Sequence, residues 1–408
     1  MTDAITRMPD GASSAQTPAA SAAQPAADNR KEVKRRGLIK GIGGLAGAAI
    51  AFGAPVPAHA SNSWGTADVS DDKLVNMYTL MLRSRWWEAS MKDAFLGGKD
   101  GLYGPCHLYI GEEAVAVGMI SALNPDDYIA STHRGHGHLI AKGGDLKKMS
   151  AELFFRNDGY NKGFGGSMHL TDVSRGILGM NGIVGPSHLL AAGAAYGIKV
   201  RGTKQVAMSF GGDGSVNNGW FYSALRNASL YKLPLVAVIE NNGYQIDMPT
   251  EKTIALAELA TIAKGLEIPG ETVDGNDVLA VNAVAQRAVA RARDGLGPTL
   301  IEAKTYRWFD HAGMAGAKID EFGAFGLPYR TDREVRYWMA RDPVARMRTF
   351  LIGEKLLTEE NDAKLVADVK KEVADALEFA RNSPHPPGDL GLRNVYAEGS
   401  VSPSQFIG

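Results

Sequence analysis

Two short polar segments carry the residues of this chain best suited to binding a cation and a phosphate group. Gly211-Gly212-Asp213-Gly214-Ser215 follows an apolar run at residues 206–210, and Glu240-Asn241-Asn242-Gly243-Tyr244 ends a second apolar run at residues 235–240. Asp213 and Asn242 stand 29 positions apart, which matches one strand–helix–strand unit. Because a right-handed crossover brings the carboxyl ends of two parallel strands together, we expect both residues on one edge of a sheet.

This edge would have the chemistry of a magnesium–diphosphate site. A carboxylate, a side-chain amide oxygen and a backbone carbonyl leave an octahedral Mg²⁺ room for two diphosphate oxygens and a water. Gly212 and Gly214 would let the backbone approach a phosphate, with amides at the start of the following helix pointing at it. The nearby pair Asn217-Asn218 is too close to Asp213 to come from a second strand, so we exclude it.

The elements around these segments indicate an α/β fold. Short apolar runs alternate with stretches of helical periodicity, which predicts a doubly wound parallel sheet with extra C-terminal helices. Residues 61–330 would form the diphosphate- and metal-binding domain, and residues 331–408 would add helices and a tail to it. We expect strands at 128–131, 206–210, 235–240 and 299–304, helices at 71–95, 111–123, 145–156, 186–201, 216–231, 255–265 and 277–294, and two outer helices within 331–382.

The Gly-Asp-Gly and Asn-Asn segments together resemble the thiamine diphosphate motif, and other segments make the likeness more specific. Cys106-His107-Leu108 is followed by Gly111-Glu112-Glu113-Ala114, and residues 132–138 read Thr-His-Arg-Gly-His-Gly-His. With residues 165–169 and 181–185, these segments resemble the alpha subunits of the decarboxylating component in pyruvate, branched-chain and acetoin dehydrogenase complexes. The resemblance runs from about residue 71 to residue 385.

The resemblance implies thiamine diphosphate and Mg²⁺ as cofactors. It gives catalytic roles beside the thiazolium ring to His107 and His311. Pyruvate-type members often carry tyrosine at position 133, so the histidine here is more similar to the acetoin type. Asp213, Asn242 and the carbonyl of Tyr244 would hold the metal, and the cofactor would contact His133, Arg134, Gly182, Val184, Gly212, Asp213, Gly214, Ser215, Asn242 and Tyr244.

The sequence departs from the family pattern around His311. Asp310 stands where the family usually has glycine, Ala312 where it often has serine, and residues 312–328 look longer than the usual loop. A carboxylate beside the histidine is expected to raise its pKa.

The resemblance implies the alpha subunit of a dehydrogenase that acts on a 2-oxo acid such as pyruvate, or on acetoin. The chain has a single α/β unit, so the carboxylate that activates the cofactor would come from a beta subunit, in an α2β2 assembly. Two other interpretations remain open. One is the amino-terminal half of a split transketolase, and the other is an exported accessory protein of the same fold without turnover. The sequence identifies neither the substrate nor the electron acceptor.

The first sixty residues have the order of an export signal. A low-complexity tail, residues 1–30, precedes a basic cluster that contains Arg35-Arg36, a Gly/Ala-rich apolar run at 38–54, and Ala58-His59-Ala60. This order predicts a twin-arginine signal, cleavage after Ala60 and a periplasmic enzyme, and the run is too short to span a membrane. The alternative is a cytoplasmic enzyme, for which a lipoyl acyltransferase becomes a possible partner.

Charge and cysteine content exclude two further features, a general affinity for polyanions and a disulfide framework. The net charge of −1 gives no general affinity for nucleic acid or for an anionic membrane surface. A single cysteine, Cys106, excludes an internal disulfide.

Overall fold

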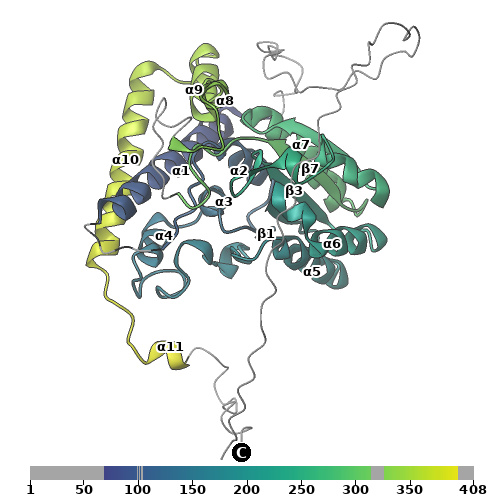
Figure 1. Ribbon diagram of the computed structural model, residues 1–408, viewed down its shortest axis with the longest axis horizontal. Helices are drawn as coiled ribbons and strands as arrows, with labels where there is room; N and C mark the ends of the chain where they lie inside the picture. Colours follow the sequence, from purple (N-terminus) through teal and green to yellow (C-terminus); the bar gives the residue numbers. More distant parts are fainter. Residues whose placement is uncertain (1–68, 99, 101, 103, 314–325, 394–408) are drawn as a thin grey trace, which may run out of the picture. The chain divides into compact units, whose positions relative to one another are not determined.

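The computed structural model describes residues 69–393, apart from residues 99, 101, 103 and 314–325. The described part is built on a five-stranded parallel sheet with the strand order β1-β2-β3-β7-β6 (Figure 1). The α/β prediction with a doubly wound parallel sheet is therefore confirmed. The strands are β1 (Tyr128–Ala130), β2 (Ala207–Gly212), β3 (Leu235–Asn241), β6 (Gly270–Asp274) and β7 (Thr299–Lys304), and a small hairpin joins β4 (Tyr244–Gln245) to β5 (Met248–Pro249).

Helices cover both faces of the sheet because successive residues of a strand point to opposite faces. On β2, Met208 and Phe210 join one apolar cluster, while Ala207 joins another. The first cluster includes side chains of α1 (Asp71–Gly97), α2 (Glu113–Ile120), α3 (His136–Ala141), α4 (Leu146–Leu153) and α7 (Val278–Arg293). The opposite face packs on α5 (Pro186–Arg201), α6 (Gly219–Leu230) and the 3-10 segment η6 (Leu259–Leu266).

Polar caps set the starts of several helices. The side chains of Ser70, Asp145 and Asp277 accept hydrogen bonds from the first backbone N–H groups of α1, α4 and α7. Pro186 opens α5, as expected of a residue that lacks the N–H which a first turn leaves unpaired. Most predicted helices therefore begin within a few residues of the observed ones.

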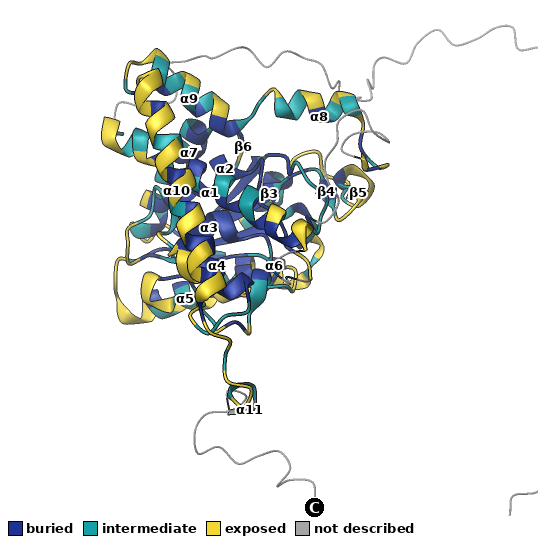
Figure 2. Cartoon of the chain, turned by 90° about the vertical axis from the view of Figure 1, so that its left-hand side faces the viewer, coloured by how far each residue is buried: buried dark blue, intermediate teal, exposed yellow. Residues whose placement is uncertain are grey.

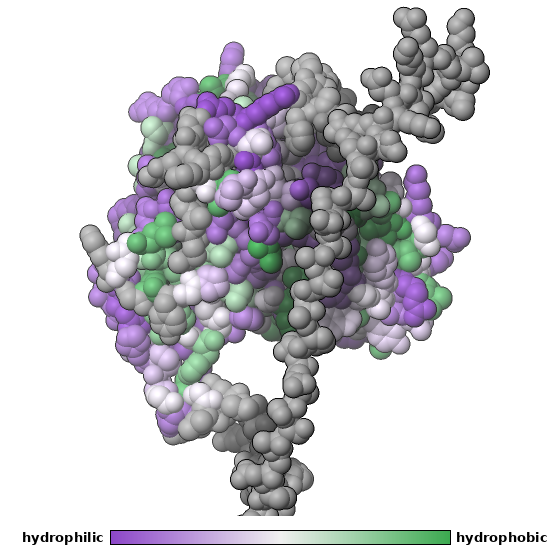
Figure 3. Space-filling view, viewed as in Figure 1, coloured by the Kyte–Doolittle hydropathy of each residue, from purple (hydrophilic) through white to green (hydrophobic). Residues whose placement is uncertain are grey.

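The C-terminal part differs from the prediction of two helices in residues 331–382. It forms three helices, α8 (Asp332–Met339), α9 (Pro343–Gly353) and α10 (Glu359–Asn382), followed by α11 (Leu390–Arg393). The chain breaks before Pro343 because proline cannot continue the preceding helix, and Asp342 caps the new one. α10 packs on α1 and α4 and turns an exposed side outward (Figure 2), and hydrophilic side chains predominate over α8 and α9 (Figure 3).

The helix predicted at 255–265 is also wrong in type. Residues Leu259–Leu266 wind as 3-10 turns. The backbone N–H of Ala260 donates to the buried Glu302 carboxylate, and Gly270 of β6 lies against the carbonyl of Ala260. Strand β6 itself was not predicted. Within the described part of the chain, every helix is too short or too polar to cross a lipid bilayer. The predicted signal, residues 1–60, lies outside the described residues.

Candidate active site

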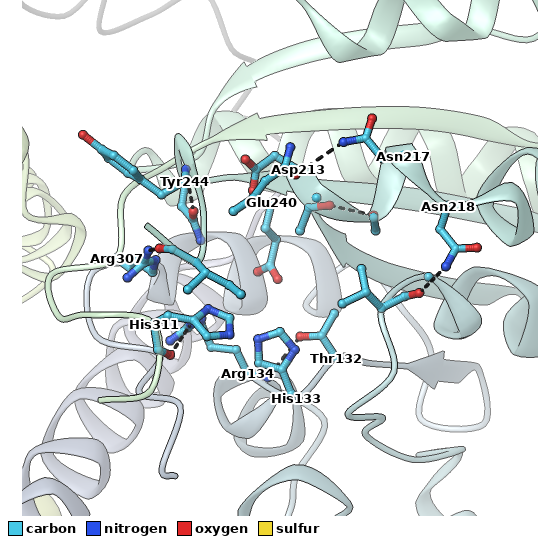
Figure 4. Close-up of a pocket in the computed structure, with 18 of the residues that line it drawn as sticks. Thr132, His133, Arg134, Asp213, Asn217, Asn218, Glu240, Tyr244, Arg307 and His311 are labelled. Atoms are coloured by element: carbon cyan, nitrogen blue, oxygen red, sulfur yellow. Dashed lines mark hydrogen bonds between the residues drawn. The ribbon is translucent and has the colours of Figure 1, made fainter. Parts of the chain in front are cut away.

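The carboxyl ends of four neighbouring strands open into one cavity of about 530 Å³. Gly212 at the end of β2 pairs with Glu240 of β3, and Glu240 pairs with Ala303 of β7, so the segments that follow these strands emerge at one edge. Figure 4 shows Asp213 and Tyr244 on one side of the cavity and His133 and His311 on the other. The lining includes Thr132, His133 and Arg134 after β1, Gly212–Ser215 after β2, Asn242 and Tyr244 after β3, and Arg307 and His311 after β7.

The polar side of the cavity carries the predicted metal-binding residues. Asp213 is 2% exposed, and the hydroxyl of Thr250 donates to its carboxylate. Burial raises the pKa of Asp213, while the Thr250 hydroxyl and the Arg307 charge act in the opposite direction. The backbone N–H of Tyr244 donates to Asn242 Oδ1 over 3.3 Å. A buried carboxylate and an amide oxygen thus stand on adjacent strand ends, as the spacing predicted.

The turn after β2 leaves space for a ligand. A methyl group added at Gly212 would meet no protein atom within 4 Å, although the residue lines the cavity. The turn is closed by Ser215, whose hydroxyl donates to the Gly212 carbonyl over 2.6 Å. Asn217 and Asn218 also line the cavity, but they come from the same segment as Asp213, as expected.

Two arginines lie beside this cavity. Arg134 donates through Nη1 to the carbonyl of Leu108 and through Nη2 to the carbonyl of His311, both over 2.8 Å. Burial lowers the pKa of Arg134 to about 10, which still leaves it charged at neutral pH. Sequence reasoning missed Arg307, which donates to the carbonyls of Ile246 and Phe309. The available signal was its position three residues after the end of β7.

Three histidines from distant segments meet on the other side. The ring centroid of His107 lies 4.5 Å from that of His133 and 4.9 Å from that of His311, and the last two are 5.0 Å apart. Burial and then the Arg134 charge lower the pKa of His107 and His133 to about 2 and that of His311 to about 3. The expectation that Asp310 raises the pKa of His311 is therefore wrong: burial and two arginines outweigh the neighbouring carboxylate. Residues 314–325 of the longer segment lie outside the described residues.

The remaining predicted residues divide into two groups. Val184 lines the cavity, and its carbonyl accepts a hydrogen bond from Asn218. Gly182 belongs to the same turn but is not among the described residues that line the cavity.

Sequence reasoning also missed Glu112 and Glu240, two buried carboxylates in the lining. Burial, then the neighbouring Glu240, raises the pKa of Glu112 to about 8.

Comparison with known proteins agrees with this architecture. Residues 80–388 match the sequence model of the family described as "Dehydrogenase E1 component". The chain is 41% identical to the alpha subunit of acetoin:2,6-dichlorophenolindophenol oxidoreductase from Bacillus subtilis (strain 168), over 80% of this chain and 95% of that protein. The corresponding subunit from Cupriavidus necator is 42% identical over 62% of this chain and 76% of its own length.

A pyruvate dehydrogenase relative is similar over almost the same span. The pyruvate dehydrogenase E1 component subunit alpha of Porphyra purpurea is 36% identical over 78% of this chain and 91% of its own length. The family match covers the sheet together with helices α8, α9 and α10. This chain therefore belongs to the dehydrogenase E1 component family, whose members are oxidoreductases.

Proposed function

We propose that this chain is the alpha subunit of an acetoin dehydrogenase that uses thiamine diphosphate and Mg²⁺. The observation that carries the choice of acetoin is the lining of the histidine side. His133 and His311 line the cavity and His107 packs against both, and all three are neutral at physiological pH. A neutral hydroxyketone needs no counter-ion there, whereas the carboxylate of a 2-oxo acid does.

The sequence comparisons favour the same choice. Both acetoin-type relatives share 41 to 42% identity with the chain, against 36% for the pyruvate dehydrogenase relative. The match to the dehydrogenase family also favours this function over half of a split transketolase and over an accessory protein without turnover.

The residues on the polar side fit the two cofactors. Asp213 is a buried carboxylate whose raised pKa would return toward its ordinary value beside a cation. Asp213, Asn242 and the carbonyl of Tyr244 would hold Mg²⁺, and Arg134 and Arg307 would face the diphosphate. When bound, thiamine diphosphate supplies a carbon nucleophile and an electron sink.

The histidines would handle protons at the substrate. A neutral imidazole can hold a substrate oxygen by a hydrogen bond, and its pKa would rise when a bound diphosphate offsets the Arg134 charge, so that it could then accept the proton of a ketol hydroxyl and return it in a later step. The T-shaped contacts of the His107 ring with His133 and His311 fix the relative orientation of these rings. His133 and His311 line the cavity, while His107 is buried behind them with its Nδ1 lacking a hydrogen-bond partner in the described structure.

A beta subunit would complete the site, in an α2β2 assembly. The rim of the cavity is apolar and exposed, with Ile183, Val184, Ile246 and Met248 between 45% and 62% exposed. Exposed large apolar side chains also occur on α5 and α6, among them Tyr196, Val200, Trp220 and Leu230. Exposed large apolar side chains around a binding cavity are typical of a protein interface. The partner would supply the carboxylate that activates the aminopyrimidine of the cofactor.

The location of the enzyme decides its electron acceptor. We propose twin-arginine export with cleavage after Ala60, because Arg35-Arg36 precede a weakly apolar run and a small-x-small site. A lipoyl acyltransferase would be the acceptor only in a cytoplasmic enzyme. Replacing both arginines with lysine should keep the protein in the cytoplasm. An unmutated protein that stays cytoplasmic with its original N-terminus would contradict export.

The function is tested by purifying the chain with its beta subunit and supplying acetoin or pyruvate with 2,6-dichlorophenolindophenol. Acetoin and water should yield acetaldehyde and acetate, with one dye molecule reduced by two electrons. We expect kcat/KM for acetoin to exceed that for pyruvate by at least about tenfold, a difference of roughly 1.4 kcal/mol. A preference for pyruvate would overturn the choice of substrate, and turnover by the chain alone would overturn the need for a partner.

A further inference from the structure

We propose that Glu112 is a positioning residue that acts on both cofactor-binding groups, through Asn242 and through Arg134. The inference rests on the proposed Mg²⁺ and thiamine diphosphate site and adds to it a residue outside the strand ends. Glu112 is 1% exposed at the start of α2 and lines the cavity. Its backbone N–H donates to the Tyr109 carbonyl over 3.1 Å, which fixes where the side chain begins.

The first contact of Glu112 sets the orientation of an amide. The backbone N–H of Tyr244 can only donate, so the Asn242 atom 3.3 Å from it is the oxygen Oδ1. The Nδ2 group consequently faces Glu112 and donates to Oε1 over 3.1 Å. Mg²⁺ takes oxygen ligands, and a flipped amide would offer it an NH₂ group. Glu112 thus keeps Asn242 in the orientation that the metal requires.

The second contact is with the arginine. Glu112 Oε2 lies 3.7 Å from Arg134 Nε and has no hydrogen-bond partner in the described structure. Both side chains are almost fully buried. One carboxylate therefore joins the segment after β3 to the segment after β1, so the metal ligand and the diphosphate-binding arginine share a single partner. Removing it leaves a buried cation and a buried amide N–H less well paired.

The neighbouring carboxylate provides a matched control. Glu113 is also fully buried and follows Glu112 directly, but it accepts hydrogen bonds from Arg85 over 2.6 and 3.1 Å and from the Gly111 N–H over 3.0 Å. Replacing it removes a buried carboxylate from the same helix start without touching Asn242 or Arg134. Any loss specific to position 112 is therefore a property of the cofactor site.

The experiment compares Glu112→Leu, Glu112→Gln and Glu113→Gln in the full chain purified with its beta subunit. Calorimetry measures Mg²⁺ binding at saturating thiamine diphosphate, and thiamine diphosphate binding at saturating Mg²⁺. Loss of a residue that orients a metal ligand typically weakens metal binding by about 10- to 100-fold. We expect that loss in Glu112→Leu. Glu112→Gln keeps an oxygen for Asn242, so Mg²⁺ affinity should stay within about threefold of wild type. Its NH₂ group then faces Arg134 Nε, donor against donor, so thiamine diphosphate should bind less tightly.

Unfolding of the cofactor-free variants separates this role from a purely structural one. Glu113→Gln should lower the unfolding midpoint and leave both affinities unchanged. Wild-type Mg²⁺ affinity in Glu112→Leu, or equal losses in Glu112→Leu and Glu112→Gln, would overturn the positioning role while the proposed function stands. A wild-type protein that binds neither Mg²⁺ nor thiamine diphosphate would overturn both. Should Glu112→Leu fail to fold, Glu112→Gln tests the proposal through its affinities for Mg²⁺ and for thiamine diphosphate. Wild-type affinity for both would contradict the positioning role.

Discussion

The two sides of the cavity are built in different ways. The polar side takes Asp213 and Asn242 from the ends of adjacent strands, where the register Gly212–Glu240 sets their separation. The histidine side takes its three rings from a loop before α2, the turn after β1 and the segment after β7. Hydrogen bonds within the sheet position the first pair, whereas packing between distant loops positions the second group.

The electrostatics of the two sides differ as well. On the polar side, burial works against the charge that a metal ligand must carry, so the pKa of Asp213 is raised until a cation binds. On the histidine side, burial and Arg134 keep the imidazoles neutral, and a bound anion that offset the arginine would raise their pKa. The protonation of both sides therefore depends on the ligand: a cation would favour the ionised Asp213 carboxylate, and an anion beside Arg134 would favour the protonated imidazoles.

Replacing the charged metal ligand should have the largest effect. Asp213→Ala leaves Mg²⁺ with only neutral protein ligands, so we expect cofactor binding to fall by at least about 100-fold. Calorimetric titration with thiamine diphosphate and Mg²⁺ measures the loss. Asp145→Ala, which removes only an exposed helix cap, should bind as the wild type does. Wild-type affinity in Asp213→Ala would mean that the polar side does not hold the metal.

Replacing a histidine should change turnover and leave binding intact. We expect His311→Asn to lower kcat by about 100-fold, the lower end of what a positioned acid or base contributes. Its affinity for thiamine diphosphate and Mg²⁺ should stay within about threefold of wild type. His385→Asn, at an exposed position after α10, serves as the control. If His311→Asn weakens binding of thiamine diphosphate and Mg²⁺ but leaves kcat unchanged, the histidine side also binds the cofactor. The assignment of cofactor binding to the polar side alone would then be wrong.

The polar side could be predicted from the sequence, because parallel strands of one sheet bring their carboxyl ends together and local spacing is enough. The histidine side could not be derived this way: His107 and His311 are 204 positions apart, and only the family resemblance indicated that they meet. Burial, which the neighbouring Asp310 could not reveal, then determined the protonation of His311. The pKa of a loop residue depends on which distant segments pack around it, and the local sequence pattern does not show that packing.

The missed elements and residues have the same explanation. Strand β6 is a sheet edge on which only Val273 is buried, so it lacks the continuous apolar run that indicates a central strand. The sequence does not distinguish the adjacent carboxylates of Glu112 and Glu113, but in the structure Glu112 faces Arg134 while Glu113 faces Arg85. The break before Pro343 was readable from the sequence, since proline is typical of a first helical turn.

A smaller effect is expected at the glycine of the polar side. In Gly212→Ala the new methyl group meets no protein atom within 4 Å, and the backbone φ of −74° suits alanine. The unfolding midpoint should therefore be unchanged or slightly raised, by at most about 1 kcal/mol in free energy. Cofactor affinity should fall by about tenfold, because the methyl group projects into space that the diphosphate would use. Gly353→Ala, in helix α9 and also without a neighbour, should raise the free energy of unfolding by at most about 1 kcal/mol and leave cofactor affinity unchanged.

The last effect concerns the acid stability of the cofactor-free chain and isolates the histidine side. Histidines of the unfolded chain titrate near pH 6.5, whereas His133 and His311 have a pKa of about 2 and about 3 when folded. The unfolded chain therefore binds more protons below pH 6.5, and the free energy of unfolding falls as the pH drops through that value. Each histidine should remove about 1 kcal/mol between pH 7.5 and 5.5. Urea denaturation of His133→Asn/His311→Asn should accordingly show a smaller loss over this interval than the wild type, while His385→Asn should match the wild type. An equal loss in the double variant would show that the two imidazoles are not held neutral by the fold.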